Sequence, residues 1–93
     1  MPITRKELIK ENYLILRKAL KEFVSDSFLP SLEEFEIIDV IRYLNLFFPK
    51  GKEDEYKHTI YIFVSEKEIR ISDDDLQIVY NLIIVFVYFL NDI

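Results

Sequence analysis

The single histidine of the chain, His58, is the first residue to test for a chemical role. A general base needs a nucleophile or an orienting partner within hydrogen-bonding reach, and no pattern around His58 supplies either. It stands between Lys57 and Thr59, at the start of a stretch of β-forming residues, which indicates an exposed structural position. One histidine also cannot form a histidine pair for a metal ion. We therefore predict no catalytic residue and no enzymatic activity.

Clusters of acidic residues are the other candidates for chemistry. Asp73, Asp74 and Asp75 could offer carboxylate oxygens to a divalent cation. They also directly precede a long apolar stretch, where negative charge stabilises the N-terminus of a helix, and we favour this structural role. The acidic run at residues 53–55 is interpreted as a solvated loop. No metal ion is expected.

Composition narrows the remaining classes of function. The chain has no cysteine and one glycine, so it lacks a thiolate nucleophile, a zinc–thiolate site and a glycine-rich phosphate loop. No cofactor or small-molecule substrate is therefore expected. The net charge of −5 argues against direct nucleic-acid binding, which depends on neutralising phosphates. Hydrophobic residues make up 51% of the chain, a large supply for the modest core of 93 residues. We predict one domain over residues 1–93, with apolar surface left for a partner.

A first helix is predicted over residues 3–24. Thr4 and Glu7 have the spacing of a capping box, in which a hydroxyl accepts a hydrogen bond from the backbone three residues later. Apolar residues at helical spacing then form the stripe that should face the core. This stripe comprises Ile9, Tyr13, Leu16, Leu20 and Phe23, and it is widened by Leu8, Ile15 and Ala19.

A second helix is predicted after a short connection at residues 25–29, where Phe28 and Leu29 should fill space between helices. Ser31 and Glu34 form another capping box and indicate the start of this helix. Pro49 and the glycine that follows it end the helix.

A β-hairpin is predicted next, from residues 56–65 and 68–72, because both runs are rich in β-forming residues. Its two-residue turn would be Glu66 and Lys67, which lack the glycine or asparagine that tight hairpin turns prefer. This register keeps the aliphatic residues on one face, with Val64 opposite Ile69 and Ile62 opposite Ile71. Tyr61, Phe63 and Arg70 would share the outer face, and aromatic residues beside arginine are typical of protein interfaces.

A long C-terminal helix is predicted over residues 76–90, since 13 of these 15 residues are apolar or aromatic. Ser72 and Asp75 provide its capping box. A membrane-spanning helix needs about 20 apolar residues, so we expect a buried core helix and no membrane insertion. Its least apolar stripe should face solvent, and this stripe comprises Gln77, Asn81, Ile84, Tyr88 and Asn91.

The predicted fold class is therefore α+β, in the order α-α-β-β-α. Helices followed by a hairpin and a long C-terminal helix resemble the layout of winged-helix DNA-binding regulators. That resemblance implies a transcriptional regulator whose residues 25–48 form two short helices. The segment would offer only Arg42 and Asn45 to base edges, too few for specific readout, so we keep it as the alternative.

The favoured function is a non-catalytic protein–protein interaction module. It would be a homodimer or a small accessory or regulatory subunit of a larger assembly, such as nucleic-acid-processing machinery. The composition, rich in isoleucine, lysine and glutamate, resembles that of proteins from thermophilic archaea and their viruses, and a cytoplasmic setting is expected. The predicted partner-binding residues are Tyr61, Phe63, Arg70, Ile84 and Tyr88.

Overall fold

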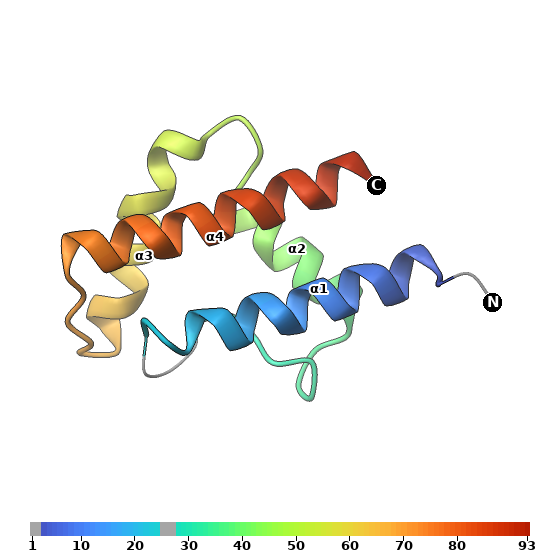
Figure 1. Cartoon of the computed structure of the whole chain (residues 1–93), viewed down its shortest axis with the longest axis horizontal. Coiled ribbons are helices and arrows are strands. Elements are labelled where there is room, and N and C mark those ends of the chain that lie inside the picture. The colour runs from blue at the N-terminus through green and yellow to red at the C-terminus, as the bar shows by residue number, and fades with distance from the viewer. Residues whose placement is uncertain (1–2, 25–27) are drawn as a thin grey trace.

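The computed structural model describes residues 3–24 and 28–93, and their regular structure is entirely helical (Figure 1). The predicted α+β fold is therefore wrong, because these residues contain no β-strand. Of the predicted connection at 25–29, residues 25–27 lie outside the described part, and Phe28 and Leu29 are buried. The elements are α1 (Arg5–Leu20), α2 (Ile37–Phe47), the 3-10 helix η1 (Glu53–Glu55), α3 (Tyr56–Glu66) and α4 (Asp73–Asp92).

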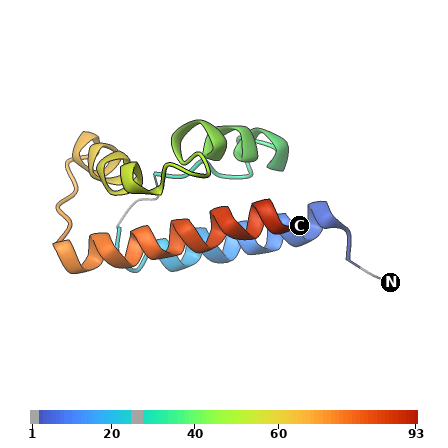
Figure 2. The ribbon, with the colours of Figure 1, turned by 90° about the horizontal axis from the view of Figure 1, so that it is seen from above.

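The helices form two layers (Figure 2). Helices α1 and α4 lie side by side and antiparallel in one layer, while α2 and α3 lie in the other. The molecule measures 43 × 28 × 20 Å, and its shortest dimension matches two helices of about 10 Å diameter. The core lies between the layers and includes Tyr13, Val40, Ile60 and Ile83, one from each helix. Since α2 and α3 cover only one face of the α1–α4 layer, none of the described elements lies over its other face.

Helix α3 occupies the stretch predicted as the first strand of the hairpin. Tyr56, Ile60 and Val64 recur every four residues, and each is at most 1% exposed. A strand would also place these three on one face, but together with His58 and Ile62, which are exposed. In a helix those two residues turn away from the core while the other three face it. The acidic residues of η1 also precede α3 and suit the positive end of its dipole. Burial of this stripe outweighs the β propensity of the individual residues.

The predicted hairpin turn is the C-terminal end of α3. The N–H of Ile69 donates to the carbonyl of Val64 at 2.9 Å, and the N–H of Glu68 donates to that of Ser65 at 3.0 Å. These two bonds form a Schellman motif, which requires a left-handed residue just beyond the helix. Glu68 is that residue, with a φ of 58°. The predicted proximity of residues 64 and 69 is real, but a helix end produces it instead of a strand pair.

Replacing Glu68 with glycine is expected to raise the free energy of unfolding by about 0.5 to 1 kcal/mol. Glycine adopts positive φ without the steric cost that a side chain incurs there. Lys67→Gly is the matched control, because Lys67 has a φ of −90° and gains nothing from glycine. Urea unfolding of both variants measures the difference. A loss of stability in Glu68→Gly would contradict the left-handed helix end.

In two of the three predicted capping boxes, the predicted hydrogen bond from the backbone to the hydroxyl is present. Thr4 accepts a hydrogen bond from the N–H of Glu7 and Ser72 accepts one from that of Asp75, each at 3.1 Å. The third prediction is wrong, because Ser31 begins only a single turn. Helix α2 starts at Ile37, where its buried stripe begins, since packing of an apolar face supplies most of the stability of a short helix.

The alternative prediction of a winged-helix layout is also wrong for the described residues. Its hairpin is replaced by α3, and residues 28–48 contain one α-helix instead of two short ones. Within residues 3–24 and 28–93, no helix combines the length and apolar character needed to cross a membrane.

Buried tyrosines attach the connecting segments to the helices. The hydroxyl of Tyr13 donates to the carbonyl of Pro30. The hydroxyl of Tyr56 lies 2.9 Å from the carbonyl oxygen of Phe48 and 2.7 Å from that of Pro49, so its proton is shared between two acceptors. Burial raises the pKa of both tyrosines above the ordinary value of 10, and the pKa of Tyr56 reaches about 12. The nearby carboxylate of Glu53 also raises the pKa of Tyr56.

Stability is expected to fall as the pH rises from 10 to about 12. Below this window, Tyr56 is protonated in both folded and unfolded chains, so its contribution is fully present. Within it, the unfolded chain loses the proton while the folded chain keeps it, which favours unfolding. Urea unfolding across this range should show a shallower decline in Tyr56→Phe than in the parent chain. Equal pH slopes in the two proteins would contradict the prediction.

Candidate interaction surface

The residues considered first for chemistry lie on the surface and are not assembled into one site. His58 is exposed on α3, and Asp73, Asp74 and Asp75 form the first turn of α4. In the part of the chain that the structure describes, no group of three histidine, aspartate or glutamate side chains could hold a metal ion. The three aspartates lie at the positive end of the dipole of α4.

The three residues predicted on the outer hairpin face are separated by the helix. Tyr61 is 56% exposed, and it lines a shallow depression together with Arg70. Phe63 is two residues further along α3, a rotation of about 200°, and lies among other aromatic rings. Its ring stacks on that of Phe28 with centroids 5.8 Å apart. The structure therefore brings Tyr61 and Arg70 together and places Phe63 against the core.

The two residues predicted on the C-terminal helix have different surroundings. Ile84 is partly buried and packs against the core. Tyr88 is 45% exposed and hydrogen-bonds the carboxylate of Glu53. That carboxylate also accepts the N–H of Gly51 at 2.9 Å, and this bond is the main reason that the pKa of Glu53 is lowered, with Tyr88 contributing less. Tyr88 thus links α4 to the loop before α3. A role in partner binding stays a prediction for all five residues.

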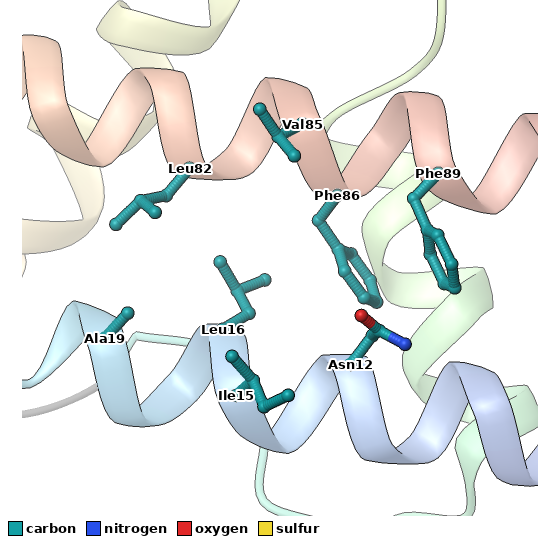
Figure 3. Close-up of a pocket in the computed structure, with 8 residues that line it drawn as sticks. All are labelled: Asn12, Ile15, Leu16, Ala19, Leu82, Val85, Phe86 and Phe89. Atoms are coloured by element: carbon teal, nitrogen blue, oxygen red, sulfur yellow. The ribbon is translucent and has the colours of Figure 1, made fainter.

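A groove between α1 and α4 was not predicted from the sequence (Figure 3). It lies on the face of the α1–α4 layer opposite α2 and α3. The only amide in its lining belongs to Asn12, which donates to the carbonyl of Leu8 at 2.8 Å. The other lining side chains are apolar, with Ile15, Leu16 and Ala19 from α1 and Leu82, Val85, Phe86 and Phe89 from α4.

The most exposed apolar residues of this groove are Ile15 and Val85. Ile15 is 64% exposed, so its predicted place in the core stripe of the first helix is wrong. Val85 is 67% exposed, although the sequence placed it on a covered side of the last helix. Ile78 lies two helical turns before Val85 on the same side of α4, and it is 38% exposed. We call the exposed side of the α1–α4 layer the outer face.

Two strips of exposed side chains make up the outer face. Residues three or four positions apart share one side of a helix, which defines each strip. In each strip, exposed apolar residues alternate with polar or charged ones. On α1 and just beyond it the strip is Glu11, Ile15, Lys18 and Glu22, and on α4 it is Asp74, Ile78, Asn81, Val85 and Asp92.

The two helices that form the outer face carry opposite charge. Helix α1 has five basic and two acidic residues, a net charge of +3. Helix α4 has four aspartates and no basic residue, a net charge of −4. Most of the basic residues of α1 lie away from the outer face, because Lys6, Lys10 and Arg17 line depressions beside α2 and the segment that precedes it. The outer face is therefore apolar along its central groove and acidic at its edges.

The sequence contained a signal for this surface. The apolar character of residues 76–90 nearly all round the helix indicated that one side could lack cover. The sequence could not show which side, because that depends on how α2 and α3 lie across the α1–α4 layer.

Comparisons with models of protein families, with curated proteins and with solved structures found no match to this chain. The class of molecule is therefore defined by its own geometry. Over residues 3–24 and 28–93 it comprises four α-helices in two layers, with an apolar groove on one open face.

Proposed function

We propose that this chain is a non-catalytic protein–protein interaction module. It acts through the outer face of the α1–α4 layer, as a small accessory or regulatory subunit or as a dimer. The observation that carries the proposal is the exposure of Ile15 and Val85, at 64% and 67%, along one continuous apolar groove.

Contiguous apolar surface supports this proposal more strongly than scattered apolar residues would. Single exposed hydrophobic residues are ordinary on soluble proteins, whereas a continuous patch with a polar rim is typical of interaction sites. Leu46 on α2 is 72% exposed but belongs to the other layer, away from the groove. The central groove also lacks charged residues, as the centres of protein interfaces do.

The proposal is tested by isolating the tagged chain from its native host together with its bound proteins. Val85→Asp places a charge at the middle of the groove and should weaken a complex by about 30-fold or more, the effect of a central interface residue. Leu46→Asp is the matched control, because it adds the same charge at an equally exposed position. Circular dichroism establishes that both variants retain the helical fold.

The expected result is that Leu46→Asp retains the same bound proteins or self-association as the parent chain, while Val85→Asp loses them. If both variants retain every association, the outer face is not the binding surface. If the parent chain forms no specific association with itself or another protein, the proposed function is wrong.

A further inference from the structure

We propose that a second surface of this chain, where the first turns of α1 and α2 meet, binds an acidic peptide segment that carries large apolar side chains. Two neighbouring depressions form this surface, and they share Lys6 and Ile37 in their linings. We call it the basic surface. It lies between α1 and α2, whereas the outer face is on the opposite side of the α1–α4 layer, so this inference goes beyond the proposed function.

The basic surface is apolar at its floor and along part of its border. Ile9 and Ile37 line it and are each 5% exposed. Phe35 and Ile38 each line one of the two depressions and are 44% and 56% exposed. Large apolar side chains that stay exposed beside a concave surface are typical of sites that bury side chains of a partner. Each depression would therefore receive an apolar side chain of the bound segment.

Positive charge is concentrated at the border of the basic surface. Arg5, Lys6 and Lys10 line it, against the single carboxylate of Glu36. None of these three cations forms an ion pair with a described residue. The nearby Glu34 lines the separate depression that contains Arg17. In a chain with a net charge of −5, this local excess of positive charge makes a segment with carboxylates the electrostatic complement.

The positions of Arg5 and Lys6 are unfavourable for the folding of α1. Both lie in its first turn, at the positive end of the helix dipole, where a cation is destabilising. Helix α4 follows the opposite pattern, with aspartates in its first turn. Natural sequences depart from such local rules chiefly at functional sites. The carboxylates of a bound segment would stabilise these two cations, which the fold by itself does not.

The chemistry of the basic surface favours a peptide over the other anionic partners. Nucleic-acid binding depends on neutralising many phosphates, and three cations around an apolar floor supply few such contacts. A lipid bilayer is flat at this scale and would leave both depressions unfilled. A peptide segment supplies carboxylates and apolar side chains at the same time.

The first measurement selects binders from a random peptide library displayed on phage, with the full chain immobilised. The proposal expects a set of acidic peptides with large apolar residues, whose binding falls about 10-fold or more in Ile38→Asp. Leu46→Asp is the matched control, because it adds the same charge on α2 at a position that is 72% exposed. The proposal is overturned if no selected peptide depends on Ile38, or if those that do are neutral or basic.

The second measurement reverses the charges of Arg5 and Lys6 together, by Arg5→Glu and Lys6→Glu. Binding of the selected acidic peptides should fall about 10-fold or more, because attraction becomes repulsion. The urea midpoint should rise, since acids suit the positive end of α1. Lys18→Glu with Lys21→Glu makes the same change in net charge near the other end of α1 and should leave peptide affinity close to that of the parent chain. Equal losses in the two double variants would overturn the proposal.

Two further probes test the other anionic partners under the same conditions. They are labelled single-stranded DNA and vesicles that contain phosphatidylserine. The proposal expects neither to bind in a way that Arg5→Glu with Lys6→Glu abolishes. Binding that this double variant abolishes, in the absence of Ile38-dependent peptides, would assign the surface to that partner and overturn the proposal.

Failure of this inference differs from failure of the proposed function. Val85→Asp lies on the outer face and should leave the acidic peptides bound. A chain whose host proteins are lost in Val85→Asp, but which selects no Ile38-dependent peptide, loses the basic surface and keeps the proposed function. A chain that selects such peptides and binds no host protein through the outer face gives the reverse result.

Discussion

Replacing Phe86 with alanine is expected to lower the free energy of unfolding by about 3 to 5 kcal/mol. Phe86 is 5% exposed and lies between α1 and α4, with its ring centroid 5.8 Å from that of Tyr13 and 5.9 Å from that of Phe89. Alanine removes the ring, its transfer free energy and both aromatic contacts, and a cavity remains because the helices close only in part. Urea unfolding measures the loss.

Val85→Ala is the control, since Val85 is the preceding residue but is 67% exposed. Its substitution should change the free energy of unfolding by no more than about 0.5 kcal/mol. A loss under about 1 kcal/mol in Phe86→Ala would show that α1 and α4 do not pack through this ring.

Replacing Phe48 with alanine is expected to cost a similar amount, about 3 to 5 kcal/mol. Phe48 is 1% exposed and follows α2, where its ring meets that of Tyr56 edge-on at a centroid distance of 5.2 Å. It also lies 6.5 Å from the ring of Phe28 and 6.4 Å from that of Phe63. The substitution would therefore loosen the contact between α2, α3 and the segment that precedes α2. Thermal and urea unfolding both measure this loss.

Phe35→Ala is the matched control, because it removes the same side chain at a position that is 44% exposed. A cost near 1 kcal/mol or less is expected there. Equal losses in the two variants would contradict the aromatic cluster as a source of stability.

Helices α1 and α4 were predictable because their signals are local. A hydroxyl at the N-cap and an acid three residues later occur at Thr4 and again at Ser72, and both hydroxyls accept the expected hydrogen bond. Ser31 carries the same local pattern but starts no α-helix, because residues 33–36 are all exposed and have no face to bury. A capping pattern therefore indicates a helix start only when a buried stripe follows it at once.

Helix α3 shows the limit of propensity. Isoleucine, valine, phenylalanine and tyrosine favour strands, and Tyr56, Ile60 and Val64 would share one face of a strand as well as of a helix. The two cases differ at His58 and Ile62, which would share that strand face but are exposed in the structure. Their exposure depends on tertiary packing, so the sequence pattern alone did not distinguish helix from strand. The strand prediction placed two of the predicted binding residues, Tyr61 and Phe63, on one face. In helix α3 they point in different directions, because residues two positions apart share a face of a strand but not of a helix.

The sequence by itself determined that the chain has a long apolar C-terminal helix, a capped N-terminal helix and more hydrophobic residues than its core needs. These properties follow from composition and from contacts within a few residues. Only the tertiary structure decided which apolar residues stay exposed, because exposure depends on the packing of helices distant in sequence. Helices α2 and α3 cover one face of the α1–α4 layer, so Ile15 and Val85 remain open on the other.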